Sequence, residues 1–168
     1  MTDIFPADKA RFREAMARLG AAVNIITTHG PEGDNGFTAS AVCSVTDDPA
    51  TILVCMNRNS SQYEIFKTSG IFCVNILTPE QEALSPVFAG KMTMAERFTH
   101  GEWIRLATGA PVLEMAAAAL DCTVSQMVDV GTHSVMFGTV QAIHLGPRGD
   151  GLIYHGRAYH KIALQSTP

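Results

Sequence analysis

Short β-type segments separated by turn-forming residues run along most of the chain, and this pattern restricts the fold more than any other feature. Within each segment β-branched and other apolar residues alternate or cluster, and glycine, proline, asparagine or aspartate follows within a few positions. Antiparallel strands with short turns and few helices predict a mainly β protein whose strands form a barrel. The predicted strands are residues 21–29, 36–46, 51–56, 70–77, 114–130, 134–145 and 152–155.

Only three helices are predicted, and all are short. Asp8 can cap the first, in which apolar residues at positions 12, 15, 16 and 19 recur with the period of a helix that packs on a core. Residues 62–68 form the second, and a proline begins the third, which covers residues 79–87. Residues 102–111 contain the only tryptophan and are expected to be irregular.

The length and composition indicate a single domain, residues 1–168, that associates with other subunits. A chain of 168 residues is near the commonest size for one hydrophobic core. Hydrophobic residues make up 46% of the chain and charged residues only 17%, which is more apolar than a monomer needs and predicts an oligomer interface. The formal net charge is −4 and the lysines and arginines are dispersed, so nucleic acid is not an expected partner.

The cysteines and the N-terminus predict a soluble protein of the cytoplasm. Cys43, Cys55, Cys73 and Cys122 fall in apolar, strand-like segments, and no two have the C-x-x-C spacing of a zinc site or redox dithiol. Buried free thiols fit a reducing compartment. The first residues contain no basic segment followed by an apolar run, and no window is long and apolar enough to span a membrane.

Residues 36–61 combine two features of a nucleotide site. Residues 38–46 alternate small polar with small apolar side chains, so a flat ring could lie against them. Residues 57–61 offer short donors just before a predicted helix, where backbone N–H groups can bind an anion. A flat ring and a phosphate together describe a flavin nucleotide. A solvated hairpin whose polar side chains face water is the alternative, and the residues alone leave both interpretations open.

Motifs of other nucleotide-binding and hydrolytic enzymes are absent. The sequence has no G-x-G-x-x-G after a strand and no G-x-x-x-x-G-K-[ST], so neither a Rossmann site nor a P-loop is predicted. It also has no nucleophile elbow and no H-E-x-x-H. Three histidines near turns late in the chain lack the spacing of a metal site, so no metal is predicted. Asn75 interrupts an apolar strand, and we expect its amide to pair with buried backbone groups.

Several linked motifs together resemble a known family. AAVNIITT, GFTASAVCSVTDDP, CVNIL, FAGK…RF, VGTH and the late AYH, in this order, are similar to the short-chain flavin reductases that serve two-component monooxygenases. The resemblance extends from Phe12 to His160. Within the family it looks most similar to the branch of the Rut pyrimidine-degradation pathway. The reductase component of 4-hydroxyphenylacetate 3-monooxygenase looks similar over the first hundred residues, but less so around FAGKMTMAERF and LDCTVSQMVDVGTH.

The resemblance implies a fold and an activity. The fold would be a split β-barrel homodimer that binds FMN, or FAD, without a Rossmann domain. The activity would be hydride transfer from NADH to the flavin, followed by release of reduced flavin to a flavin-dependent monooxygenase, here in pyrimidine (uracil) degradation. The alternatives are a split-barrel protein that only binds flavin, and a related oxidase without NADH-reductase activity.

The resemblance also assigns site residues. The isoalloxazine ring would be bordered by Thr38, Ala39, Ser40 and Ala41, with Ser44, Val45 and Thr46 beside them. The ribityl-phosphate end would be held by Asn59, Ser60 and Ser61 and closed over by Phe88, Ala89, Gly90 and Lys91. The nicotinamide side would be lined by His133, Tyr159 and His160, and by His155, where relatives often have an aromatic residue. No catalytic side chain is expected, because the flavin carries the chemistry.

Overall fold

The structure, a computed structural model, describes residues 4–165 and is mainly β with few, short helices, as predicted. The helices are α1 Lys9–Ala17, α2 Tyr63–Ser69, η1 Pro79–Gln81 (a 3₁₀ turn), α3 Leu84–Ala89 and α4 Met94–Arg97. The strands are β1 Ala21–Ala22, β2 Asn24–Gly30, β3 Gly33–Ala39, β4 Val42–Asp47, β5 Ala50–Asn57, β6 Ile71–Ile76, β7 Trp103–Arg105, β8 Pro111–Leu113, β9 Ala118–Val130, β10 His133–Leu145, β11 Gly151–His155 and β12 Ala158–Ile162.

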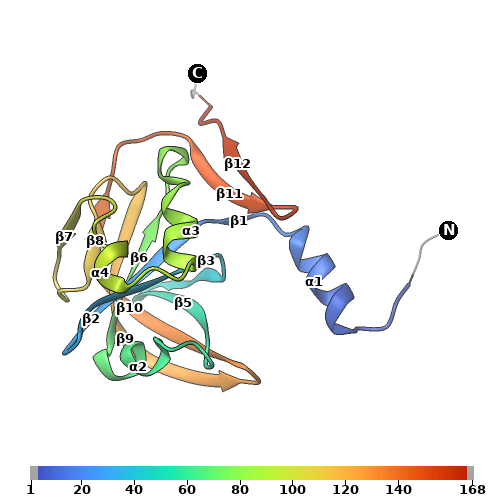
Figure 1. The fold of residues 1–168 in the computed structure, drawn as a ribbon, viewed down its shortest axis with the longest axis horizontal. Coiled ribbons are helices and arrows are strands. Elements are labelled where there is room, and N and C mark those ends of the chain that lie inside the picture. The colour runs from blue at the N-terminus through green and yellow to red at the C-terminus, as the bar shows by residue number, and fades with distance from the viewer. Residues whose placement is uncertain (1–3, 166–168) are drawn as a thin grey trace.

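One antiparallel sheet of seven strands forms the centre of the molecule, in the order β3-β2-β6-β9-β10-β5-β4 (Figure 1). Its two edge strands, β3 and β4, are consecutive in the chain and are separated only by Ser40 and Ala41. Because two residues span so short a distance, the opposite edges of the sheet must approach each other at this point. The Cys55 N–H donates to the Ala41 carbonyl at 3.1 Å, which ties this connection to β5.

The hairpin of β11 and β12 pairs with the short strand β1 in a separate three-stranded sheet. Its two-residue turn consists of Gly156 and Arg157, which have positive φ angles of 59° and 65°. Two consecutive residues with positive φ are typical of a type I′ turn, whose twist matches that of the strands it joins. Through β1, the hairpin lies beside the N-terminal end of β2.

The seven-stranded sheet is covered on both faces by apolar clusters. On β2, Ile25 and Ile26 are both fully buried, yet they belong to different clusters because successive side chains of a strand point to opposite faces. The cluster around Ile26 includes Phe66 of α2, and the cluster around Ile25 includes Phe88 of α3. The two helices therefore cover opposite sides of the same strand.

Asn75 on β6 has the structural role that its sequence context predicts. Its side-chain amide donates to the Ile25 carbonyl at 3.1 Å and to Thr27 Oγ1 at 3.2 Å, and its Oδ1 accepts from the Leu113 N–H at 2.7 Å. The residue is fully buried. Its three hydrogen bonds join β6 to β2 and to β8.

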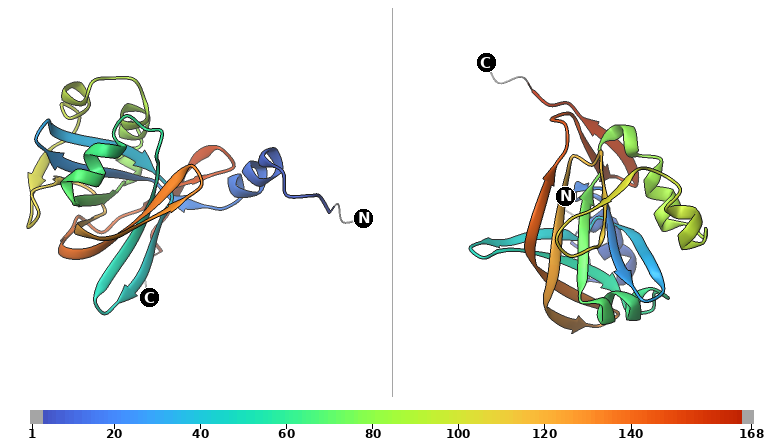
Figure 2. Two further views of the ribbon diagram at one scale, coloured as in Figure 1. Left: turned by 90° about the horizontal axis from the view of Figure 1, so that it is seen from below. Right: turned by 90° about the vertical axis from the view of Figure 1, so that its left-hand side faces the viewer.

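The prediction that the first helix packs on the core is wrong. Asp8 caps α1 as expected, because its carboxylate accepts from the Arg11 N–H at 2.9 Å. However, no residue of α1 is buried, and Phe12 remains 64% exposed. The helix stands apart from the body of the molecule in both Figure 1 and Figure 2. Helical periodicity identifies an apolar face, but it does not identify what covers that face.

Other segments also differ from the prediction. The strand predicted at residues 36–46 is broken at Ser40 and Ala41 into β3 and β4. The helix predicted at residues 79–87 is divided into η1 and α3. Residues 102–111, expected to be irregular, contribute β7 and the start of β8, which pair with each other. These differences depend on pairing partners that are distant in the sequence or on where the chain must turn.

Replacing Asn75 by alanine should lower the free energy of unfolding by about 2–4 kcal/mol, because a buried carbonyl and a buried N–H would lose their partners. Gln141 provides a matched control, since it is also a strand amide but is exposed, and Gln141→Ala should change stability by less than about 0.5 kcal/mol. Denaturant unfolding of the two variants measures the difference. Equal midpoints would contradict the role given to Asn75.

Candidate functional site

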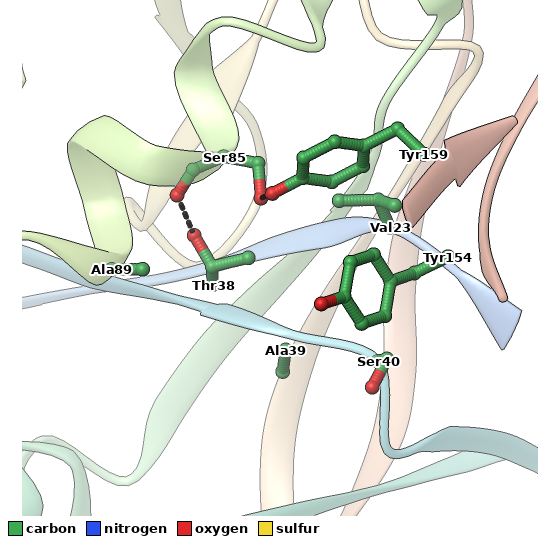
Figure 3. A pocket seen from close by; sticks show the side chains of 8 residues that line it. All are labelled: Val23, Thr38, Ala39, Ser40, Ser85, Ala89, Tyr154 and Tyr159. Carbon is green, nitrogen blue, oxygen red and sulfur yellow. Dashed lines mark hydrogen bonds between the residues drawn. The ribbon is translucent and has the colours of Figure 1, made fainter. Parts of the chain in front are cut away.

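A cavity of about 200 Å³ lies between β3, α3 and the β11–β12 hairpin (Figure 3). It is lined by Val23, Thr38, Ala39, Ser40, Ser85, Ala89, Tyr154 and Tyr159. Five of these residues come from segments that the sequence resemblance assigned to a flavin or nicotinamide site, although those segments are far apart in the chain. The fold thus brings Thr38, Ala39 and Ser40 together with Ala89 and Tyr159.

Hydrogen bonds fix two walls of this cavity. Thr38 Oγ1 donates to the Ser85 carbonyl at 2.6 Å, which joins β3 to α3. The Ser85 and Tyr159 hydroxyls lie 2.8 Å apart and share a hydrogen bond, which joins α3 to the hairpin. The Tyr154 and Tyr159 rings, direct cross-strand partners, pack edge to face with centroids 5.2 Å apart. The cavity is therefore a preformed slot with aromatic and small side chains, a combination that suits a flat ring.

A second cavity, a groove of about 660 Å³, lies where the edges of the seven-stranded sheet approach each other. Its lining is mostly apolar and includes Ala41, Cys43, Ser44 and Cys55, and Ser40 lines both cavities. The N–H groups of Ser40 and Ala41 donate to no acceptor in the described part of the chain. Residues 38–44 therefore border two adjoining hollows and present free backbone donors between them.

Val45 and Thr46 lie outside both cavities in this chain. The Val45 side chain is 48% exposed, and the Thr46 hydroxyl accepts from the Asp48 N–H at 3.2 Å in the turn of the β4–β5 hairpin. This hairpin extends away from the body of the molecule (Figure 2). The structure thus separates Val45 and Thr46 from Thr38 and Ser40, with which the resemblance had grouped them.

The two segments assigned to the phosphate end lie on opposite faces of β3. A Cβ placed on Gly36 would meet the Phe88 ring at 3.0 Å, so α3 and the residues after it lie on that face. The next residue, Phe37, packs on Phe66 of α2 with ring centroids 5.1 Å apart. The turn that precedes α2, which contains Asn59, Ser60 and Ser61, therefore belongs to the other face. A ligand at the free edge of β3 would lie between the two segments.

The turn before α2 is partly occupied with its own hydrogen bonds. The Asn59 N–H donates to Asn57 Oδ1 at 2.9 Å, and the Ser60 hydroxyl accepts from the Gln62 N–H at 3.3 Å. Arg58 pairs with Asp129 at 3.4 Å. A hydrogen bond from Ser134, together with the Arg58 charge and the Tyr63 hydroxyl, holds the pKa of Asp129 below its ordinary value.

His133 lies beside this turn and not beside Tyr159. In the register of β5 and β10 it is the partner of Asn57, at the tip of the long β9–β10 hairpin. Its Nδ1 lies 2.9 Å from the Thr132 hydroxyl. Within one chain, the structure therefore does not bring His133 together with the cavity that Tyr159 lines.

His155 and His160 face away from the tyrosine-lined cavity. Tyr154 and Tyr159 are opposite one another on one face of the hairpin, so the residue that follows each of them points to the other face. There the two imidazoles lie with centroids 5.9 Å apart, and His160 Nε2 is 3.1 Å from the His155 carbonyl. The pair Tyr159 and His160 is thus divided between two surfaces.

Sequence reasoning missed three residues of the cavity, which are Val23, Ser85 and Tyr154. Tyr154 could have been found from the hairpin register, because a two-residue turn at Gly156 and Arg157 makes it the partner of Tyr159. Ser85 carried no comparable signal. Its importance comes from the contacts of a short helix with two distant strands.

The cysteines have different environments. Cys73 and Cys122 are fully buried, and burial together with the nearby Asp121 carboxylate raises the pKa of Cys122 to about 12. Cys43, in contrast, is exposed and Cys55 is half-buried, contrary to the expectation that all four thiols are buried, because both border the open groove beside Ala41. Within residues 4–165 no group of three or more potential ligands could hold a metal ion.

The family model of the flavin reductase like domain matches residues 16–163, which is nearly the whole chain. The chain belongs to this family. It is 57% identical to the FMN reductase (NADH) RutF of Variovorax paradoxus (strain S110), over 92% of this chain and 86% of that protein. Among solved structures, it resembles the flavin reductase PheA2, with a TM-score of 0.84 and 31% identity over 94% of this chain and all of that one.

A third similar protein is BorF, the flavin reductase component of a bacterial two-component tryptophan halogenase. Its structure matches with a TM-score of 0.87 and 26% identity, over 94% of this chain and all of that one. The family predicted from the linked sequence motifs is thereby confirmed.

No helix within the described residues is long and apolar enough to cross a bilayer.

Proposed function

We propose that this protein is an NADH-dependent FMN reductase. The observation that carries the proposal is the pairing of high similarity to FMN reductase (NADH) RutF with a preformed slot at Thr38, Ser40 and Tyr159, which are motif residues of the family. The protein would pass a hydride from NADH to FMN, with FAD as an alternative acceptor. It would then release the reduced flavin.

The residues present fit a flavin. Small side chains along residues 38–41 leave room for a flat ring, and the free N–H groups of Ser40 and Ala41 are suited to its oxygen and nitrogen acceptors. The adjoining cavities share Ser40, so two rings could meet there. This arrangement needs no Rossmann glycines, which agrees with their absence from the sequence.

The chain's own contribution would be binding and alignment. Hydride transfer from nicotinamide C4 to N5 is the chemistry that a bound flavin supplies. Tyr159, fixed by Ser85, and Tyr154 would form a rigid wall that holds a ring in contact with residues 38–41 and excludes water. The backbone N–H groups of Ser40 and Ala41 would stabilise negative charge on the ring. No single side chain is then required as an acid or a base.

The fold that supports this function would be a split β-barrel formed by the whole chain, residues 1–168, as one domain. The approach of β3 and β4 at Ser40 supports this proposal, since the seven-stranded sheet must curve to bring its edges together. The groove at this point would be the split. The phosphate would then lie at the free edge of β3, within reach of Ser60, Ser61 and Lys91.

The reduced flavin would be used by a separate flavin-dependent monooxygenase in the cytoplasm. The similarity to BorF, a reductase component of a two-component system, supports transfer of this kind. The Rut name of the similar curated protein supports pyrimidine degradation as the pathway. The nicotinamide side would include His133, His155 and His160 only if the surfaces that carry these histidines are brought to the cavity that Tyr159 lines.

The active form would be a homodimer. Exposed apolar residues on α1, just after it, and on β4 and β9, among them Phe12, Leu19, Val45 and Val130, support this proposal. A two-fold partner would cover them and would also protect the free strand edges.

Purified protein should oxidise NADH when FMN is added, and more slowly with riboflavin, because riboflavin lacks the phosphate contacts. Absorbance at 340 nm measures the reaction under anaerobic and aerobic conditions. A protein that binds FMN without consuming NADH would be a passive flavin carrier. Oxygen consumption driven by an amine and not by NADH would instead indicate an oxidase.

Light scattering at micromolar concentration should give twice the chain mass of 18.0 kDa. Replacing Phe12 and Leu19 together by serine should shift the protein toward the monomer, since both side chains are exposed, the first on α1 and the second just after it. The double replacement of Lys9 and Arg18 by serine is a control on the same segment. A parent protein that elutes and scatters as a monomer would contradict the proposed dimer.

Lys91→Ala should weaken FMN binding about ten- to a hundredfold, because it removes a charge-assisted contact of roughly 1.5–3 kcal/mol with the phosphate. Riboflavin affinity is the internal control and should not change. The loss for FMN should shrink as salt concentration rises, since the Lys91 side chain is exposed and the pair would be screened. Unchanged FMN affinity would make Lys91 a surface lysine and leave the phosphate to backbone N–H groups and serine hydroxyls.

A further inference from the structure

Arg97, the last residue of α4, is a buried cation without a carboxylate partner. The residue is only 6% exposed, and it takes part in none of the ion pairs of residues 4–165. Removing a charge from water is costly unless hydrogen bonds replace its hydration. For Arg97 this replacement comes entirely from the main chain.

Four backbone carbonyls surround the guanidinium. Nε donates to the Met92 carbonyl at 3.0 Å, and Nη2 donates to the Gly90 carbonyl at 2.7 Å. Nη1 donates to the Phe88 carbonyl at 2.9 Å and to the Gly36 carbonyl at 3.3 Å. Three of the four acceptors belong to residues 88–92, which are the end of α3 and the segment that follows it, and the fourth belongs to β3.

The segment 88–92 depends on this guanidinium for its shape. Beyond Gly90 it forms no helix or strand, and α4 begins only after Thr93, whose hydroxyl and N–H complete a capping box with Glu96. Arg97 therefore replaces the hydrogen bonds that a regular element would supply. It also ties the segment to β3 two residues before Thr38, which lines the cavity.

The inward carbonyls determine what the segment presents outward. In a trans peptide the C=O and the following N–H point in opposite directions. Because the Gly90 carbonyl points at Arg97, the Lys91 N–H points away from it, and this N–H donates to no acceptor among the described residues. The Lys91 side chain is also exposed, and Ala89, two residues earlier, lines the cavity.

We propose that Arg97 is a positioning residue that holds residues 88–92 as a phosphate-binding loop and thereby directs the Lys91 N–H and ammonium toward the flavin phosphate. This inference rests on the proposed function. The role is one of positioning and not of direct phosphate contact, because four of the five Arg97 donors are already occupied by carbonyls.

The geometry explains why arginine is needed there. A guanidinium has five donors in a planar fork and can serve four carbonyls at once, whereas a lysine ammonium has three donors at a single point. Burial lowers the pKa of Arg97 from its ordinary value, but that value is so high that the group stays charged at neutral pH. Arg97→Lys therefore keeps the charge and loses the fork.

The test compares FMN and riboflavin binding to Arg97→Lys and Arg97→Met by flavin fluorescence. Arg97→Lys should bind FMN about tenfold more weakly, with riboflavin affinity and kcat at saturating FMN within about twofold of the parent. Arg105→Met is the matched control, because Arg105 is exposed, bonds the Gly109 carbonyl and Asp34, and should leave FMN affinity unchanged. Equal losses for FMN and riboflavin would show a merely structural role and overturn the proposal.

A double-mutant cycle tests whether Arg97 acts through Lys91. In the Arg97→Lys background, Lys91→Ala should cost at least threefold less FMN affinity than it costs in the parent, because the loop no longer presents the ammonium correctly. Independent, multiplicative losses would overturn the proposal.

Gly90→Ala perturbs the same loop without changing Arg97, and it keeps the proposal testable if the arginine variants do not fold. A Cβ at Gly90 would meet the Pro86 carbonyl at 2.8 Å, so the backbone at Gly90 or Pro86 must shift, and this perturbs the loop whose Gly90 carbonyl bonds to the guanidinium. The same selective loss of FMN affinity is expected, and an unchanged FMN-to-riboflavin ratio would overturn the inference. A parent that fails to oxidise NADH would overturn only the proposed function, since these binding ratios still decide the role of Arg97.

Discussion

Ser40 and Ala41 join two strands that lie at opposite edges of one seven-stranded sheet, and the arrangement of the candidate site follows from this short connection. The sheet has to curve until its edges approach, which creates the groove beside Ala41. The Ala41 carbonyl of this connection bonds to β5, but the N–H groups of Ser40 and Ala41 are left free within the described residues. Unpaired edge groups are normally a liability in β proteins. In the proposed site they would be the donors that a bound ring needs, and the rest of the fold places side chains around them.

The two faces of β3 contact different parts of the molecule. Phe37 and Ala39 pack on the cluster around Phe66, while Gly36 and Thr38 contact the side of Arg97 and Ser85. On the face of β3 that α3 covers, position 36 must be small, because Phe88 lies only 3.0 Å from where a Cβ on Gly36 would be. Two contacts therefore favour small residues along β3. One is the close approach of α3, and the other is the cavity that begins at Thr38.

Features fixed by local sequence could be predicted, and features fixed by distant contacts could not. The strands, the Asp8 cap and the pairing role of Asn75 follow from periodicity and from the cost of burying an amide alone. The exposure of α1 and the carbonyl cage of Arg97 do not, since Arg97 meets a carbonyl 61 positions away. The motifs indicated which segments matter. They did not indicate that Tyr159 and His160 point to opposite surfaces, although strand alternation required it.

Two features that a single chain leaves unexplained have one explanation in the proposed dimer. The first is the apolar surface of α1, which no other part of residues 4–165 covers. The second is the separation of His133 from the cavity lined by Tyr159, although both belong to motifs of the same family. In a two-fold dimer every contact between two different residues occurs twice, once in each direction. The end of one chain that carries His133 could therefore meet the cavity of its partner, and the reverse contact would form as well. A helix that projects from the body is well suited to bury its apolar face in such an arrangement. The exposed helix and the divided site would then be two consequences of one interface.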